Sequence, residues 1–207
     1  ALDYRAEFQD QSVPVQLMVT ECTAFDGEEI DNFLRSQMWD CLEDRDRILG
    51  NYRYRVIATD MLARALPAAK RAILDMDFLE ALSELYPDCE AFYFPSSGKL
   101  FTAESVRRDE TEGTNRFIYF GVNVRFFNVQ DSEDMVVDTL GMSTLFLPDL
   151  QYHFHGMNPN WVVNHAYNVA AYLLSSGNVI ADGETVDGVV DGEMSSELHW
   201  SCRYEDA

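Results

Sequence analysis

Residues 158–177 read NPNWVVNHAYNVAAYLLSSG, a stretch that carries its own start and stop signals for a helix. Asn158 followed by Pro159 is typical of an N-cap with proline in the first turn, where the missing N–H costs nothing. Gly177 suits the left-handed position that follows many helix ends. We therefore predict a helix over residues 159–176. Its inner face is expected to consist of Val162, His165, Ala166, Val169, Ala170 and Leu173.

Around this helix, the chain mixes strands and helices without the regular alternation of a parallel βαβ fold. Period-two alternation or short apolar runs predict strands at residues 13–20, 52–58, 91–95, 117–129, 150–155, 178–181 and 198–204. Helical spacing predicts helices over residues 26–47, 60–66 and 68–86, with a mobile loop over 107–115 and turns at 182–183 and 187–188. These elements indicate an α+β fold. We expect a largely antiparallel sheet with three to five helices packed on it, forming a single domain over residues 1–207.

The net charge of the chain indicates which classes of partner it can bind. The chain of 207 residues has 36 acidic and 15 basic residues, a net charge of −21, and 47% of its residues are hydrophobic. Binding a nucleic-acid backbone or an anionic membrane requires clustered Lys and Arg, so neither ligand is expected. A basic protein partner, by contrast, would be attracted by this field. The alternative interpretation is that the charge serves solubility.

The four cysteines indicate a reducing compartment. Cys22, Cys41, Cys89 and Cys202 form no CxxC pair, and Cys41 and Cys89 lie in apolar patterns typical of buried thiols. The first residues show neither a basic nor an apolar signal region, and no stretch approaches 18 consecutive apolar residues. We therefore expect a cytoplasmic protein that is not in a membrane.

Several short motifs in the C-terminal half carry a family resemblance. They are, in order, the segments 138–142 (DTLGM), 147–151 (LPDLQ), 168–172 (NVAAY), 177–180 (GNVI) and 182–186 (DGETV). In this order and spacing they resemble the bacterial domain-of-unknown-function family 4261 (DUF4261), and residues 60–86 and 92–94 look similar as well. The resemblance implies no chemistry and no functional residues. It implies a loose association with immunity partners of bacterial toxins. Asp138 itself is interpreted as the cap of a short helix that begins at Thr139.

Two histidines are the candidate metal ligands. His153 and His155 lie two residues apart on a predicted strand, so both side chains point to one face about 7 Å apart along it. This spacing suits zinc, with Asp149 and His165 as possible further ligands. The alternative is an ordinary half-exposed strand, with Asp149 in a turn or cap and His165 as a hydrogen-bonded core histidine.

Catalytic constellations are missing from the sequence. Nucleophilic catalysis needs a nucleophile, a base and an orienting group. His199 and Cys202 are three residues apart, so on a strand they point to opposite faces. No Gly-x-Ser-x-Gly elbow and no phosphate-binding glycine loop occurs. The acidic, glycine-spaced residues 182–193 do not fit the EF-hand register and are interpreted as a solvated hairpin turn. We therefore do not expect an enzyme.

Two tryptophans near acidic residues are the candidate partner-binding residues. Trp39 lies off the apolar stripe of its predicted helix, with Asp40, Glu43 and Asp44 close by, and Trp161 lies in the first turn of the helix 159–176. Exposed aromatic residues among acids could anchor and steer a basic partner. The alternative is that both tryptophans pack onto the sheet.

These features favour a non-catalytic protein-binding protein, as an immunity-type inhibitor of a bacterial toxin. A metal- or small-molecule-binding protein, with or without catalysis, that uses His153 and His155 is the alternative. A subunit of a homo-oligomer or larger assembly is a third interpretation.

Overall fold

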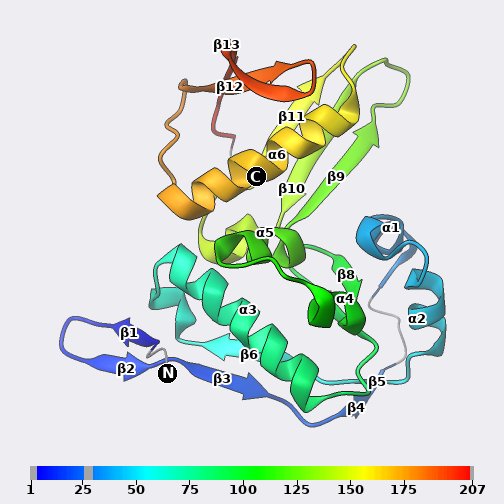
Figure 1. Cartoon of the computed structure of the whole chain (residues 1–207), viewed down its shortest axis with the longest axis vertical. Coiled ribbons are helices and arrows are strands. Elements are labelled where there is room, and N and C mark those ends of the chain that lie inside the picture. Colours follow the sequence, from blue (N-terminus) through cyan, green and yellow to red (C-terminus); the bar gives the residue numbers. More distant parts are fainter. Residues whose placement is uncertain (1–3, 26–29, 206–207) are drawn as a thin grey trace. The chain divides into compact units, whose positions relative to one another are not determined.

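The computed structural model of the chain describes residues 4–25 and 30–205 and divides into two compact units, residues 1–121 and 122–207 (Figure 1). The predicted α+β class is confirmed. All strand pairs are antiparallel, but the described strands form six small sheets instead of one large sheet, and six α-helices replace the expected three to five. The single domain over residues 1–207 stays a prediction. Each unit is described by itself below.

The first unit combines short β-ribbons with five α-helices. Its strands are β1 (Arg5–Glu7), β2 (Ser12–Pro14), β3 (Gln16–Val19), β4 (Thr23–Ala24), β5 (Tyr54–Arg55), β6 (Ala58–Met61), β7 (Ala91–Phe94) and β8 (Lys99–Thr102). Its helices are α1 (Asn32–Ser36), α2 (Arg45–Asn51), α3 (Ala68–Leu85), α4 (Ala103–Arg108) and α5 (Thr114–Gly121), with 3-10 turns η1 (Trp39–Cys41) and η2 (Ala63–Ala65). The pairs are β1 with β2, β3 with β6, β4 with β5, and β7 with β8.

Helix α3 confirms the helix predicted over residues 68–86. It begins after Pro67 and ends just before Pro87, as the two prolines require. Its buried face includes Leu74, Leu79 and Leu82, whereas the predicted inner residue Leu85 is exposed. The apolar residues spread around much of this helix, so spacing alone did not fix the side that faces the core.

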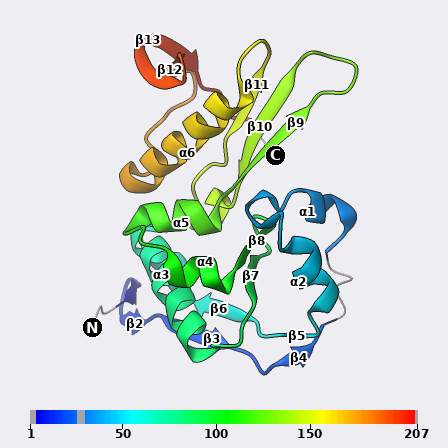
Figure 2. The ribbon, with the colours of Figure 1, turned by 45° about the vertical axis from the view of Figure 1, so that its right-hand side comes forward.

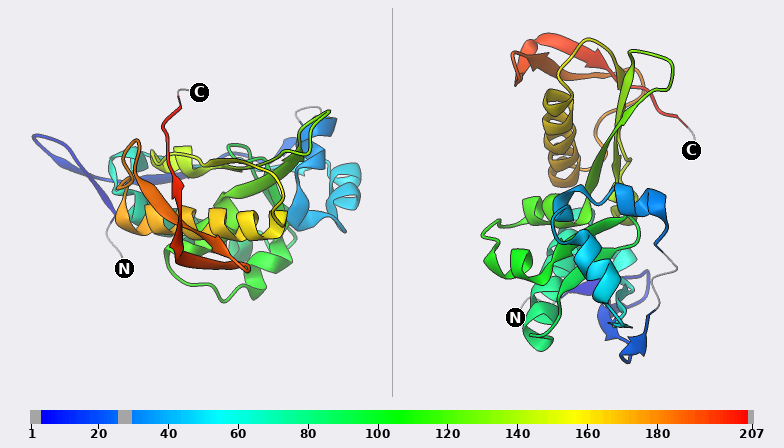
Figure 3. Two further views of the ribbon diagram at one scale, coloured as in Figure 1. Left: turned by 90° about the horizontal axis from the view of Figure 1, so that it is seen from above. Right: turned by 90° about the vertical axis from the view of Figure 1, so that its right-hand side faces the viewer.

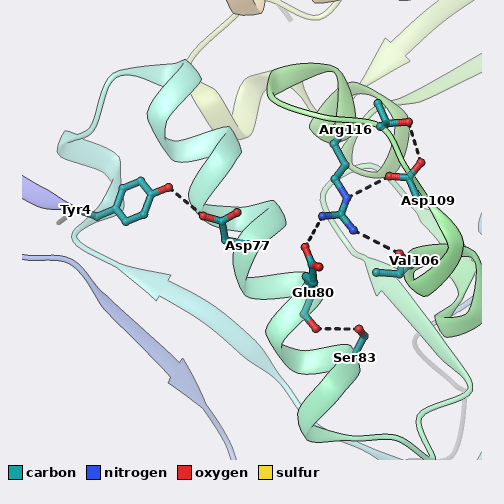
Figure 4. A network of polar contacts seen from close by, with 8 residues as sticks. Tyr4, Asp77, Glu80, Ser83, Val106, Asp109 and Arg116 are labelled. Atoms are coloured by element: carbon teal, nitrogen blue, oxygen red, sulfur yellow. Dashed lines mark hydrogen bonds and ion pairs between the residues drawn. The ribbon is translucent and has the colours of Figure 1, made fainter. Parts of the chain in front are cut away.

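A mostly buried arginine ties α3, α4 and α5 together (Figure 4). The Arg116 guanidinium on α5 donates from Nη1 to Glu80 Oε2 of α3 over 2.7 Å, and from Nε to Asp109 Oδ2 over 3.1 Å. Its Nη2 also donates to the carbonyl of Val106 on α4, over 3.3 Å. The acceptors lie on α3 and on the C-terminal half and cap of α4, and they match the fixed fork of an arginine, so this side chain joins α5 to both helices.

Two predicted helices of the first unit are wrong. The expected helix over 26–47 is instead α1, η1 and α2, and its expected start at residues 26–29 lies outside the described residues. The expected helix over 60–66 is the end of β6 followed by η2.

The expected strand over 117–129 begins with a helix, α5, before β9. The reason lies in the pair Phe117 and Gly121, four residues apart on α5. A Cβ on Gly121 would lie 2.9 Å from the Phe117 ring, so the glycine leaves room for a contact that only helical spacing creates. Because nearly all side chains in this stretch are apolar, the alternation also fitted a strand.

The second unit consists of a three-stranded sheet, one long helix and a hairpin. The sheet has the order β11-β10-β9, with β9 (Asn123–Asn128), β10 (Met135–Leu140) and β11 (Gln151–Phe154). The helix is α6 (Pro159–Ser176), the hairpin is β12 (Thr185–Val190) with β13 (Glu193–Ser201), and η3 (Met142–Leu145) follows β10. Within this unit, α6 lies along one face of the sheet (Figures 2 and 3).

Helix α6 has the bounds and the buried face that its sequence predicts. Asn158 Oδ1 accepts from the backbone N–H of Asn160 over 3.0 Å, and Gly177 follows the last turn with a φ of 84°. All six residues of the predicted inner face are buried. Val162 and Ala166 pack against Val124 and Val137 of the sheet, which makes the core of this unit.

Asp149, and not Asp138, caps the short helical turn after β10. Asp149 Oδ1 accepts from the backbone N–H of Met142 over 3.0 Å, and Oδ2 accepts from that of Ser143 over 3.3 Å. Asp138 lies within β10 and forms an ion pair with Arg125 across the β9–β10 ladder. The predicted cap was therefore assigned to the wrong aspartate, because the strand continues past Asp138 to Leu140.

The end of the chain also differs from the prediction. Residues 178–181 form no strand, and the strand expected at 198–204 is β13, which begins earlier, at Glu193. The turn expected at Asp187–Gly188 lies inside β12. A Cβ on Gly188 would lie 2.8 Å from both Leu198 Cγ and Trp200 Nε1, so this glycine serves close side-chain packing and not a turn.

The cysteines agree with the predicted thiols. All four are free, and Cys41 is buried with Met38, Ile48 and Leu100. Cys89 is only partly buried. Within residues 4–25 and 30–205, no helix has both the length and the apolar composition needed to cross a membrane.

Two partly buried aspartates in the first unit, Asp60 and Asp75, make its stability depend on pH. Arg71 on α3 binds Asp60 of β6 through two hydrogen bonds of 2.7 and 3.1 Å. Asp75 lies one turn further along α3. Burial raises the pKa of Asp75 to about 7, and the charge of Asp60 adds to this effect, while Arg71 opposes it.

We predict that Asp75→Asn stabilises the protein at pH 8 by about 1 kcal/mol or more and has little effect at pH 4. In the unfolded chain an aspartate loses its proton near pH 4, so the wild type loses stability as the pH rises from there through 7. Urea unfolding at pH 4, 6 and 8 measures the difference. Glu84→Gln, an exposed change on the same helix, is the control. Parallel pH profiles for wild type and Asp75→Asn would contradict the prediction.

Candidate functional site

The acidic charge is most concentrated in the second unit. Residues 122–207 contain thirteen Asp and Glu against two basic residues, Arg125 and Arg203, a net charge of −11. Arg125 is already neutralised by Asp138. The β12–β13 hairpin contributes Asp187, Asp191, Glu193 and Glu197, all exposed, and contains neither Lys nor Arg. This hairpin therefore presents negative charge that no Lys or Arg of its own strands offsets; His199 lies 3.6 Å from Asp187 and would pair with it only when protonated.

The same hairpin exposes apolar side chains between its acids. Val190, Met194 and Leu198 are 41%, 43% and 41% exposed. Because β12 and β13 form a two-stranded sheet, their outer edges have no strand neighbour in the described part of the chain. Apolar side chains, backbone edges without a strand neighbour and acidic charge therefore occur together on this one element.

A tight turn closes the hairpin against the first turn of α6. Asp191 and Gly192 have φ angles of 51° and 90°, the left-handed pair that two-residue hairpin turns require. A Cβ on Gly192 would lie 3.0 Å from Trp161 Nε1, so the indole of Trp161 packs directly on the turn. The glycine is thus needed both for its backbone conformation and for this close approach.

A cluster of three aromatic side chains fixes the hairpin to the sheet and helix. The rings of Tyr152 on β11 and His165 on α6 lie 5.5 Å apart, edge to face. Trp200 on β13 lies 4.5 Å from His165 and 6.0 Å from Tyr152. The cluster therefore takes one ring from each of the three elements.

His165 also joins these elements by two hydrogen bonds. Its Nε2 lies 2.6 Å from the carbonyl oxygen of Asp187, and its Nδ1 lies 3.1 Å from the Tyr152 hydroxyl. A carbonyl only accepts, so Nε2 carries the hydrogen and Nδ1 accepts from Tyr152 in the neutral imidazole. Burial lowers the pKa of His165, which favours this neutral form, although Asp187 opposes the shift. The interpretation of His165 as a hydrogen-bonded core histidine is confirmed.

A pocket of about 280 Å³ lies between α6 and the tip of the hairpin. From α6 it is lined by Trp161, Asn164, His165, Tyr167 and Asn168. From the hairpin it is lined by Val189, Gly192, Glu193 and Met194. The polar groups of this lining are amides, a carboxylate, a phenol, an indole and the imidazole already described. No Lys or Arg reaches it, so it offers no charged donor to an anion.

The predicted partner-binding residues fall into both units. Trp39 is 43% exposed at the start of η1, as its sequence suggested. Its acidic neighbours are largely compensated: Asp40 lies 3.2 Å from the buried ammonium of Lys99, and Asp44 lies 2.8 Å from Arg47. Glu43 is exposed. This surface is therefore less acidic than its sequence implies.

Trp161 combines the two interpretations offered for it. It is partly buried, because it packs on the hairpin turn, and it also lines the pocket.

The predicted metal ligands are not brought together as a set. His153 Nε2 and His155 Nδ1 lie 3.4 and 3.6 Å from the carboxylate of Asp134, at the open edge of the sheet. Asp149 caps η3 instead, and His165 is buried beneath the hairpin. In the part of the chain that the structure describes, no three His, Cys, Asp or Glu residues are arranged to hold a metal ion.

Sequence reasoning missed the amide side of the pocket. Asn164 and Asn168 are four residues apart, next to Trp161 and His165 on the same side of α6, and this spacing was visible in the sequence. The hairpin turn at residues 191–192 was visible too. Their meeting was not, because it depends on where the hairpin lies on the helix.

The family resemblance is confirmed for the C-terminal part of the chain. Residues 138–207 match the family model described as a domain of unknown function (DUF4261). This range contains β11, α6, the hairpin and every residue that lines the pocket. The similarity at residues 60–86 and 92–94 lies outside it and stays a prediction. No curated protein and no solved structure matches the chain.

We predict that Gly192→Ala displaces Trp161 and destabilises the protein by about 1 kcal/mol more than Gly183→Ala does. Both glycines have positive φ angles, 90° and 83°, so both changes carry the same backbone strain. Only at Gly192 does the new methyl group also meet the indole, since nothing lies within 4 Å of a Cβ on Gly183. Denaturant unfolding and tryptophan emission measure the two effects. Equal losses of stability with unchanged emission would show that Trp161 does not pack on the turn.

Proposed function

We propose, from the position of the acidic hairpin inside the segment that matches DUF4261, that this protein is a non-catalytic binding protein for a basic protein partner. The observation that carries the proposal is the exposed β12–β13 hairpin, whose four acids and three apolar side chains have neither Lys nor Arg among them. Charge of this kind steers association, while exposed apolar groups supply contact area. The protein surface that it fits is cationic with an apolar centre.

The hairpin is a better candidate than the surface around Trp39. Asp40 and Asp44 there form ion pairs with Lys99 and Arg47, so their negative charge is already neutralised within the first unit. Trp39 remains a second anchor, with the exposed Leu42 and Phe33 in the same stretch of chain. We expect variants of the hairpin to weaken binding more than variants of Trp39.

An immunity-type inhibitor of a bacterial toxin is one form of this function. The support for it is the family resemblance, together with acidic charge that could cover a basic toxin surface. The free thiols suit a cytoplasmic place of action. A homo-oligomer is a less favoured assembly, because two copies would bring surfaces of the same charge together.

Metal binding at His153 and His155 is the second candidate. The observation that favours it is that both imidazoles lie near one carboxylate, at 3.4 and 3.6 Å from Asp134. A zinc-dependent rise in the unfolding midpoint that His153→Ala abolishes would support this candidate.

We predict that Glu193→Lys/Glu197→Lys weakens binding of the basic partner about tenfold or more, because two attractions become repulsions. Glu84→Lys/Glu110→Lys, at exposed sites of the first unit, makes the same change in net charge and should bind like the wild type. Affinity capture from the source cell with all three forms identifies the partner. Titration of the purified partner at two salt concentrations then measures the dissociation constant.

Recovery of the same proteins with the same affinity by the wild type and both variants would overturn the proposal. A partner whose binding does not weaken with salt would also contradict it, since the proposed attraction is electrostatic.

A further inference from the structure

The pocket between α6 and the hairpin tip has the chemistry of a cation site. Asn164 and Asn168 each bring an amide with one acceptor oxygen and one NH2 donor, and Glu193 brings a carboxylate. The side chains of these three residues make no hydrogen bond or ion pair with any other described residue. Glu193 is the one charged group of the lining, which contains no Lys or Arg, so the pocket favours a ligand that carries positive charge and donates hydrogen bonds.

The aromatic residues of the lining indicate which kind of cation fits the pocket. Trp161 and Tyr167 both border the pocket, and indole and phenol faces attract cations, guanidinium groups most often. A guanidinium is planar, so it can stack on a ring while its edge donates to two or three acceptors at once. An ammonium is a compact point charge with no plane to stack on a ring, so it matches this lining less closely. His165 does not compete, because both of its nitrogens are already bonded.

The pocket is small. Its volume of about 280 Å³ is just below the range of about 300–1,000 Å³ that holds cofactors and drug-sized molecules. It suits a single side chain. It is also continuous with the acidic hairpin, since Glu193 and Met194 belong to both.

We propose that this pocket receives the guanidinium group of an arginine side chain from the basic protein partner. The inference rests on the proposed function, and it specifies which side chain of the partner is bound and where. Glu193 and the two asparagine oxygens accept from the guanidinium, and the side chains of Trp161 and Tyr167 flank it. The expected ligand is an arginine within a protein chain, because no Lys or Arg lines the pocket to bind the carboxylate of a free amino acid.

The test uses small probes and needs no partner. The wild-type protein is titrated with N-acetyl-arginine amide, its neutral analogue N-acetyl-citrulline amide, N-acetyl-lysine amide and free L-arginine. Two-dimensional NMR follows the indole N–H of Trp161 and the side-chain amides of Asn164 and Asn168. We expect saturable shifts with the capped arginine, binding at least fivefold weaker for the capped lysine, and no saturation with the citrulline compound.

Two variants locate the site on the protein. Glu193→Gln should weaken binding of the capped arginine at least fivefold, whereas Glu197→Gln, on the same strand but outside the lining, should leave it unchanged. Asn168→Leu removes an acceptor from an exposed helix position and should act like Glu193→Gln. The unchanged remainder of each spectrum confirms that the variant is folded.

Each other outcome overturns the inference in a defined way. Equal shifts with arginine and citrulline compounds would show a polar pocket without selection for charge. Tighter binding of free L-arginine than of the capped form would assign a metabolite, not a partner side chain. Binding that Glu193→Gln does not weaken would place the cation elsewhere on the acidic surface. Because no partner is present, these results stand apart from the capture experiment, in which the hairpin can still prove to be the binding surface.

Discussion

The β12–β13 hairpin depends on the buried imidazole of His165. A two-stranded hairpin is marginally stable alone, and this one also gathers four acids that repel one another. The Nε2 of His165 donates to the carbonyl of Asp187 in β12, and its ring packs on Trp200 of β13. Tyr152 completes the connection to the sheet. Uncharged side chains therefore attach the acidic hairpin to the rest of the unit. The side chains that stabilise the hairpin are different from the acidic side chains that are proposed to bind a partner.

The neutral state of His165 is what makes this arrangement stable. Burial lowers its pKa and outweighs the attraction of Asp187, so the ring is uncharged at neutral pH. For a base with a lowered pKa, the stabilisation is present above the pKa of the unfolded chain and is lost as the pH falls through the folded value. Protonation of His165 would place a charged ring in the core beneath the hairpin. It would therefore destabilise the β12–β13 hairpin, which carries the proposed binding surface.

Local signals decided which parts of the fold could be predicted. Helix α6 was predictable to the residue because Asn158, Pro159 and Gly177 set its ends and its apolar spacing set its inner face. Helix α5 was not, since Phe117 to Gly121 is apolar on every side and only the contact between these two residues distinguishes helix from strand. Gly188 was taken for a turn because its real role, room for Leu198 and Trp200, is tertiary.

In the candidate site, too, some features can be predicted from the sequence and others depend on the folded structure. The acidity of the chain, the exposure of Trp39 and the core position of His165 follow from residue type and spacing. The pocket does not, because Asn164 and Asn168 acquire a shared environment only when the hairpin turn packs on Trp161. Glu193 is the one charged side chain of the lining, and no Lys or Arg lines the pocket beside it. A guanidinium that enters from outside would supply the missing positive charge, and the amides and aromatic rings that would receive it are brought together by the same packing of the hairpin on the helix.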